Sequence, residues 1–167
     1  MRYPLPNIIV GFMAALLVAA CAAPPSSAVR LESRVLFVCE HGNVKSLMAA
    51  SYFNRLASER GLPYRALSRG VAPDSTTVPP AIVAGLRGEG FNVAMFHPIA
   101  VGVADVSTSR RVILINTALP ENMQVAGTAP EQWTDVPAAS ADYAAASAAL
   151  RRHVEKLVDD LSHSPSN

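Results

Sequence analysis

The chain has 167 residues, of which 50% are apolar, and its formal net charge at neutral pH is +1. This length and apolar content predict one compact domain with a sizeable core. Acidic and basic residues are spread along the chain, so neither a basic stripe for nucleic acid nor an acidic tail is present in the sequence. We therefore expect no nucleic-acid partner, and any anion binding must be local.

The first thirty residues differ in kind from the rest. Arg2 precedes an apolar run from Ile8 to Ala20, which suits the core of a signal peptide but is short for a membrane-spanning helix of about 20 residues. The small residues before Cys21 resemble the lipobox of bacterial lipoproteins, in which the cysteine is lipidated. Residues 1–20 are thus expected to be a signal peptide, and residues 21–30 the lipidated cysteine and a flexible Pro- and Ser-rich tether.

This leader predicts an exported protein held by its lipid at the periplasmic face of a bacterial membrane, with no other membrane contact. The alternative is a misassigned start, with Cys21 an ordinary thiol. If Cys21 is lipidated, Cys39 is the only thiol left, so neither an intramolecular disulfide nor a metal site built from cysteines is expected. We expect no metal and no cofactor, and Cys39 must be structural or reactive.

Strands and helices alternate along the remainder of the chain. Continuous apolar runs at 35–38 and 112–115 are typical of parallel strands buried on both faces, the second within an expected strand at 111–115. Weaker strand signals lie at 64–68 and 123–126. Apolar residues at helical spacing predict three helices: from 46 to the glycine at 61, from Pro79-Pro80 to the glycines at 88 and 90, and from 141 to 161. This order predicts an α/β fold, an open parallel four-stranded sheet with helices on both faces.

The segment from Cys39 to Ser46 joins the first strand to the first helix, at the edge of the sheet where ligands bind. Unpaired amides and the helix dipole at a helix start stabilise a tetrahedral oxyanion and favour the thiolate of a cysteine over its thiol. Gly42 and Asn43 tolerate the left-handed backbone that turns amides inward, and Lys45 adds a positive charge. A cysteine after a buried strand is often a core residue, but the residues at these offsets favour a nucleophile.

This segment resembles the loop of the low-molecular-weight protein tyrosine phosphatases and related thiol-dependent arsenate reductases, which reads Cys, five residues, Arg, then Ser or Thr. The resemblance covers residues 35–161 and includes Leu47-Met48-Ala49-Ala50 and Ser68-Arg69-Gly70. It implies a domain over residues 31–163, with Cys39 as the nucleophile that attacks phosphorus, Lys45 as the catalytic basic residue and Asp135 as the acid that protonates the leaving group. Residues 164–167 are expected to be a disordered tail. The phosphate-binding residues that the resemblance implies are Glu40, His41, Gly42, Asn43, Val44, Lys45 and Ser46, with Ser46 also steadying the thiolate.

Two departures from the family pattern lie in the loop. Lys45 stands where the family has Arg, and an ammonium lacks the planar two-pronged grip of a guanidinium on two phosphate oxygens. Gly42 and Asn43 stand one position later than the family's Gly-Asn pair, and His41, at the earlier position, is expected to face solvent.

A third departure lies in the turn before the last helix. The family has an Asp-Pro pair there, whereas one residue separates Asp135 from Pro137. Aromatic residues that follow this pair wall the phosphotyrosine pocket of the family, but this chain continues Ala138-Ala139-Ser140, which leaves Trp133 as a candidate wall.

The leading hypothesis is a phosphomonoester hydrolase of the tyrosine phosphatase type that works through a phospho-enzyme on Cys39. Its expected partner is a phosphorylated protein, a small phosphomonoester or a free oxyanion. Arsenate reduction is the second possibility and needs an external thiol. The third is a catalytically weak oxyanion-binding lipoprotein, because Lys45 replaces the usual Arg.

Overall fold

The computed structural model describes Met1 and residues 33–163. The expected signal peptide, the lipidation of Cys21, the tether and the tail at 164–167 lie outside the described residues. The elements follow in the order β1 (Ser33–Cys39), α1 (Lys45–Glu59), β2 (Tyr64–Gly70), α2 (Pro80–Gly88), α3 (Val103–Ser107), β3 (Ser109–Ile115), the 3₁₀ turn η1 (Glu121–Met123), β4 (Glu131–Trp133) and α4 (Tyr143–His163).

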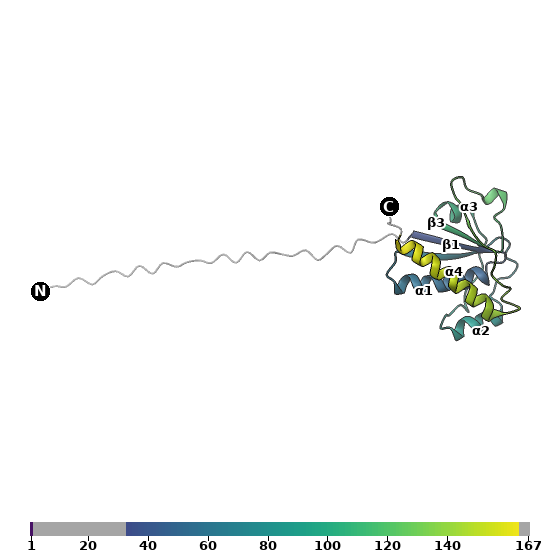
Figure 1. Ribbon diagram of the computed structural model, residues 1–167, viewed down its shortest axis with the longest axis horizontal. Coiled ribbons are helices and arrows are strands. Elements are labelled where there is room, and N and C mark those ends of the chain that lie inside the picture. Colours follow the sequence, from purple (N-terminus) through teal and green to yellow (C-terminus); the bar gives the residue numbers. More distant parts are fainter. Residues whose placement is uncertain (2–32, 164–167) are drawn as a thin grey trace.

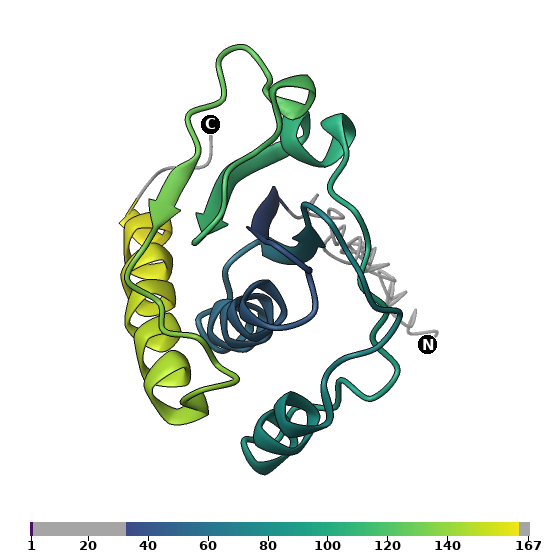
Figure 2. The ribbon, with the colours of Figure 1, turned by 90° about the vertical axis from the view of Figure 1, so that its right-hand side faces the viewer.

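The four strands form one parallel sheet in the order β2-β1-β3-β4, which confirms the predicted fold class. Val35 of β1 stands opposite Ala66 of β2 and Arg111 of β3. Helices α1, α2 and α4 lie on one side of the strands, and α3 with η1 lies on the other (Figures 1 and 2). None of the helices within residues 33–163 is long and apolar enough to cross a bilayer.

Strand β1 lies at the centre of the sheet because its apolar run faces two cores. Phe37 packs with Phe53 of α1 and with Trp133 of β4, at ring-centre distances of 5.8 and 5.5 Å, on the side of α1 and α4. Leu36 and Val38 belong to the smaller cluster on the α3 side. Burial of side chains on both faces explains why this strand reads as a continuous apolar run.

The prediction of a strand at 123–126 is wrong. Met123 and Val125 pack instead against the smaller cluster, and the fourth strand is the short, polar Glu131–Trp133 segment, which pairs only with β3. Helix α3 was not predicted. Gly102 precedes the helix, and its amide donates to the Asp105 carboxylate at 3.1 Å. The helix has five residues, too few for its sequence to show a helical period.

Helix α2 is joined to α4 by a group of polar side chains around Glu89. This carboxylate accepts hydrogen bonds from the Tyr143 and Ser147 hydroxyls at 3.0 and 3.1 Å and from the Arg151 guanidinium at 2.5 Å. The ring of Tyr143 packs where a side chain on Gly85 would stand. Burial, reinforced by the nearby Tyr52 and Glu89, raises the pKa of Tyr143, so it remains a hydroxyl donor. These contacts fix α2, which forms one wall of the site described next.

Candidate active site

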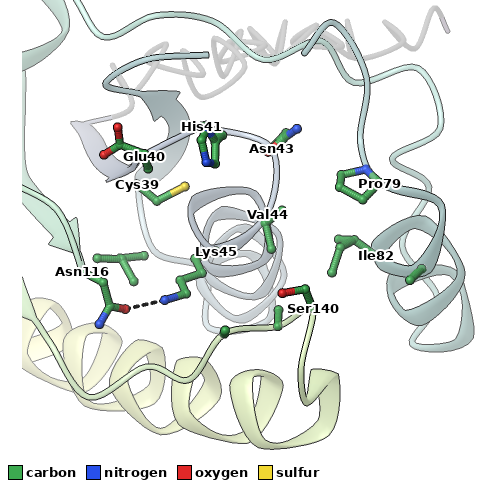
Figure 3. A pocket seen from close by; sticks show the side chains of 14 residues that line it. Cys39, Glu40, His41, Asn43, Val44, Lys45, Pro79, Ile82, Asn116 and Ser140 are labelled. Atoms are coloured by element: carbon green, nitrogen blue, oxygen red, sulfur yellow. Dashed lines mark hydrogen bonds between the residues drawn. The ribbon is translucent and has the colours of Figure 1, made fainter. Parts of the chain in front are cut away.

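Cys39 ends β1 at the base of a cavity of about 370 Å³. Its side chain is 5% exposed, and Figure 3 shows its sulfur pointing into the space between the loop and Lys45. The cavity lies at the carboxyl ends of β1 and β3, as expected for a ligand site in a parallel sheet. Its lining residues are Cys39, Glu40, His41, Asn43, Val44, Lys45, Pro79, Ala81, Ile82, Ile115, Asn116, Ala138, Ala139 and Ser140.

A chain of buried hydroxyls leads to the sulfur of Cys39. Ser46 Oγ lies 3.0 Å from Cys39 Sγ, and Ser68 Oγ lies 2.9 Å from Ser46 Oγ and 3.0 Å from the Gly42 carbonyl oxygen. When Cys39 is a thiolate, the Ser46 hydroxyl must donate to sulfur, and its oxygen is then free to accept from Ser68. Ser46 therefore has the thiolate-steadying position that was expected, and Ser68 was not predicted as a site residue.

The loop after Cys39 is held against the end of β2 by close backbone packing. Gly42 has φ +74°, and a Cβ on it would lie 2.6 Å from the Gly70 nitrogen. A Cβ on Gly70 would lie 2.6 Å from the His41 carbonyl carbon. The amides of Val71 and Ala72 donate to the carbonyls of residues 39 and 40 at 3.0 and 2.8 Å. The two glycines therefore let the loop and the strand end approach to a distance that no side chain permits.

Asn43 and His41 tie the same loop to the segment after β2. Asn43 does not adopt the left-handed backbone that was expected of it. Its buried side chain instead donates to the Thr77 carbonyl at 2.9 Å. His41 is half-exposed at the cavity rim, and its Nδ1 lies 3.2 Å from an Asp74 carboxylate oxygen. The expectation that His41 faces solvent is thus met in part.

The start of α1 leaves backbone donors available at the cavity. Val44 precedes the helix, and no side chain caps it, so Ser46 does not serve as an N-cap. Within the described part of the chain, no protein group accepts a hydrogen bond from the amides of residues 41–47. Free amides beside a cavity at a helix start form an anion-binding site.

Lys45 adds positive charge to this end of α1. Its Nζ donates to Asn116 Oδ1 at 2.7 Å and to the Val136 carbonyl at 3.0 Å, and Figure 3 shows its side chain turned toward Asn116. Burial lowers the pKa of Lys45, while the nearby Cys39 acts in the opposite direction. Lys45 thus links the loop to β3 and to the turn before α4.

Asn116 is a site residue that the sequence analysis missed. It follows β3 with φ +51°, a left-handed conformation that asparagine tolerates better than most residues. Its backbone amide donates to the Trp133 carbonyl at 2.9 Å and its Nδ2 to the Thr134 carbonyl at 2.8 Å. The sequence did indicate it: an asparagine directly follows the apolar residues of β3, at the edge of the sheet where ligands bind.

Asp135 is not brought to the cavity. Its carboxylate accepts a 2.6 Å hydrogen bond from His153 Nε2 of α4, and its side chain is 62% exposed. This hydrogen bond from His153 lowers the pKa of Asp135. The turn instead contributes Ala138, Ala139 and Ser140 to the cavity wall. The structure therefore unites Cys39, the loop and Lys45 but leaves the expected acid outside.

The expected aromatic wall is also absent from the cavity lining. Trp133 is 2% exposed, and its ring stacks on His153 at 4.6 Å. Among the described residues that line the cavity, Glu40 carries the only carboxylate, which accepts a 3.1 Å hydrogen bond from Thr117. No group of three or more His, Cys, Asp or Glu within residues 33–163 is placed to hold a metal ion.

The cavity thus brings together a cysteine, a hydroxyl 3.0 Å from its sulfur and the start of a helix whose amides have no protein acceptor, an arrangement suited to nucleophilic phosphoryl transfer. The family model described as low molecular weight phosphotyrosine protein phosphatase matches residues 34–156. The match covers most of the chain, which therefore belongs to this family of hydrolases. No curated protein matches the chain.

Solved structures share this fold at low sequence identity. The thioredoxin-dependent arsenate reductase of Corynebacterium glutamicum is 18% identical over 80% of this chain with a TM-score of 0.65, and this chain spans 63% of that one. An arsenate reductase from Archaeoglobus fulgidus is 24% identical with a TM-score of 0.62, covering 75% of this chain and 98% of its own. A low molecular weight protein tyrosine phosphatase from T. tengcongensis is 20% identical with a TM-score of 0.61, covering 77% and 99%.

Proposed function

We propose that the protein hydrolyses phosphomonoesters by transferring the phosphoryl group to Cys39. The observation that carries this proposal is the 3.0 Å contact of Cys39 Sγ with Ser46 Oγ at the base of a cavity beside free amides. The hydroxyl stabilises the thiolate, and the amides stabilise the charge that develops on the phosphoryl oxygens. Water then attacks the cysteinyl phosphate and releases phosphate. The substrate is a phosphorylated protein or a small phosphomonoester.

Protection of Cys39 from alkylation tests the site before a natural substrate is known. The experiment uses a Cys21→Ser variant, so that Cys39 is the single thiol, and measures iodoacetamide modification by mass spectrometry. Vanadate or inorganic phosphate is expected to slow modification in a saturable way. In parallel, release of phosphate from para-nitrophenyl phosphate should be abolished in Cys39→Ser. Unprotected alkylation together with equal turnover by Cys39→Ser would refute the proposal.

A second candidate is an oxyanion-binding protein with weak turnover, and the contacts of Lys45 favour it. Its ammonium is engaged by Asn116 and by the Val136 carbonyl, and it cannot grip two phosphate oxygens as a guanidinium does. Calorimetry with vanadate or phosphate separates the two candidates. Tight binding without Cys39-dependent turnover supports the binding protein, whereas turnover under the same conditions supports the phosphatase.

Arsenate reduction requires a thiol that attacks the sulfur of Cys39 after arsenate has bound. Cys39 is the one cysteine in the part of the chain that the structure describes, so this reaction depends on an external small thiol. Arsenate reduction that requires added glutathione or another small thiol would support this alternative.

The leader sequence supports a lipid-anchored location at the periplasmic face of a bacterial membrane. Its support is the order of apolar run, small residues, Cys21 and polar tether. Mass spectrometry of the mature N-terminus tests it: acylation of Cys21 is expected, and Cys21→Ser should move the protein from the membrane fraction to the soluble fraction. An unmodified residue Met1 in the mature protein would refute it.

A further inference from the structure

Three consecutive residues of the turn before α4 are each held by a different part of the fold. The Thr134 carbonyl accepts from Asn116 Nδ2 at 2.8 Å, the Asp135 carboxylate from His153 at 2.6 Å, and the Val136 carbonyl from Lys45 at 3.0 Å. These partners come from the end of β3, from α4 and from the start of α1. The orientation of the Asp135 side chain is therefore set by contacts on both sides of it.

Burial of Val136 keeps Asp135 on the outside of the turn. Val136 is 4% exposed and belongs to the main core, whereas the Asp135 side chain is 62% exposed. Rotating Asp135 into the cavity would disturb Val136, its bond to Lys45 and the pair with His153. His153 is in turn fixed by stacking on Trp133. The hydrogen bond from His153 lowers the pKa of Asp135, which favours the ionised form of this carboxylate over the form that donates a proton.

The turn presents apolar methyl groups where a proton donor would stand. Ala138 and Ala139 line the cavity together with Pro79 and Ile82, and Figure 3 shows Pro79, Ile82 and Ser140 around the same opening. The methyl groups of Ala138 and Ala139 offer a departing alkoxide neither a proton nor a hydrogen bond, and the neighbouring Ser140 hydroxyl can donate a hydrogen bond but is too weak an acid to transfer its proton. Two further side chains with exchangeable protons line the cavity: Glu40, which accepts a hydrogen bond from Thr117 at 3.1 Å, and His41, whose Nδ1 lies 3.2 Å from an Asp74 carboxylate oxygen.

We infer that Asp135 holds the turn in place through its hydrogen bond with His153 and does not protonate the leaving group. The site would then act on phosphate carried by a weakly basic oxygen, as in acyl phosphates and phosphates of acidic phenols. This inference rests on the proposed function and names its substrate class. Such leaving groups depart as stable anions, so the site can cleave them without protonating them. Esters of ordinary alcohols need that proton and are poor substrates.

The reaction balances without an added proton donor. The Cys39 thiolate forms the sulfur–phosphorus bond, the phosphorus–oxygen bond to the leaving group breaks (an anhydride bond in an acyl phosphate, an ester bond in an aryl phosphate), and its electron pair leaves on the carboxylate or phenolate. Water then attacks phosphorus, the sulfur–phosphorus bond breaks, and the electron pair returns to sulfur. The protons of that water remain on the phosphate product. Without a positioned base for the water, this second step is slow, and a burst of leaving group that matches the protein concentration is expected.

A leaving-group series tests the inference. The kcat/KM values should fall by at least about 100-fold from dinitrophenyl through para-nitrophenyl to phenyl phosphate. A general acid typically accelerates a reaction by about this factor, so its absence should slow the phenyl ester by as much. Asp135→Asn should keep the same slope. Ala138→Asp, at an exposed position whose backbone carbonyl alone makes hydrogen bonds, should raise phenyl phosphate turnover by about tenfold or more. Ala138→Asn is its matched control. Its side chain has the same size as aspartate but cannot transfer a proton, so this variant should not raise phenyl phosphate turnover.

Other outcomes overturn the inference in distinguishable ways. A flat wild-type series would show that some group protonates the leaving group. A slope that steepens in Asp135→Asn would identify Asp135 as that acid, and one that steepens in His41→Gln would identify His41. A slope that steepens in Glu40→Gln would assign that role to Glu40 instead. Absence of any Cys39-dependent release of dinitrophenol from dinitrophenyl phosphate, as a burst or as steady turnover, would refute the proposed phosphatase function itself, and the inference with it.

Discussion

Lys45 Nζ donates to Asn116 Oδ1 at 2.7 Å, joining the first residue of α1 to the residue that follows β3. Asn116 also donates to the Thr134 carbonyl at 2.8 Å, so this one side chain holds both Lys45 and the turn before α4. The charge that faces the anion and the wall of the cavity are thus positioned together.

Lys45→Arg should increase catalysis. A guanidinium offers two parallel donors to the equatorial phosphoryl oxygens, whereas the ammonium acts as a point charge. We expect kcat/KM for dinitrophenyl phosphate to rise by about tenfold or more, mostly in kcat, since the added contact stabilises the transition state. Steady-state kinetics measure the change, with Lys156→Arg on the exposed face of α4 as a matched control. A fall in kcat with unchanged folding would contradict the prediction.

Anion affinity should begin to decline at a pH below the ordinary pKa of lysine. Burial lowers the pKa of Lys45 in the free protein, so its positive charge is lost at a lower pH than for an exposed lysine. Sulfate keeps its charge over this range, and a Cys39→Ser background removes both the titration of the thiol and its opposing influence on Lys45.

Calorimetric titration of that variant with sulfate should show full affinity at neutral pH and a loss of about tenfold as Lys45 deprotonates, the value of one charge-assisted hydrogen bond. Adding Lys45→Arg should remove the decline, because arginine stays charged. An affinity that falls equally in both variants would show that another group causes it.

Gly42→Ala should destabilise both the fold and the anion site. The new Cβ would lie 2.6 Å from the Gly70 nitrogen at a residue with φ +74°, which combines a backbone clash with left-handed strain. We expect the free energy of unfolding in urea to fall by about 3 kcal/mol, and vanadate protection of Cys39 to be lost.

Gly61→Ala is the matched control for this experiment. Gly61 has φ +63° with open space around its Cβ position, so alanine there meets strain without a clash and should reduce stability by only about 1 kcal/mol. Equal losses in the two variants would mean that the contact between Gly42 and Gly70 contributes nothing.

Removal of the hydroxyls beneath Cys39 should reduce the reactivity of its thiolate in a graded way. Ser46→Ala deletes the hydroxyl that lies 3.0 Å from sulfur and should slow iodoacetamide alkylation by about tenfold, the value of one hydrogen bond to a charged group. Ser68→Ala removes only the group behind it and should have a smaller effect.

Ser51→Ala provides the comparison for these two variants, since Ser51 lies on the same helix and its hydroxyl donates to the Leu47 carbonyl at 2.8 Å. Its alkylation rate should equal that of the unaltered protein. A larger loss in Ser68→Ala than in Ser46→Ala would contradict the proposed order of hydroxyls.

Local patterns were sufficient to predict most of the sheet and the position of Cys39 at the end of its central strand. The apolar run at 35–38 predicted the central strand, because a strand covered on both faces requires apolar residues at every position. Gly61, with φ +63° just after α1, was a correct end for that helix. Cys39 followed from its place between that strand and that helix.

The fourth strand was misplaced because its sequence is polar and short. Glu131–Trp133 forms an edge strand that pairs through its backbone with β3, and this pairing does not require an apolar pattern. Met123 and Val125 have the apolar alternation of a strand, but they bury their side chains beneath α3 and β3. Which of the two segments forms the fourth strand depends on which one can lie alongside β3 in the folded protein.

The sequence by itself determined the fold class and the presence of Cys39 and Lys45 in the loop between β1 and α1, because each follows from residues close together in the chain. Only the tertiary structure decided which way Asp135 points, since His153, Lys45 and Asn116 reach that turn from three separate elements. Contacts between residues distant in sequence leave no local pattern, and they determine whether a carboxylate next to an active site faces the substrate or supports the fold.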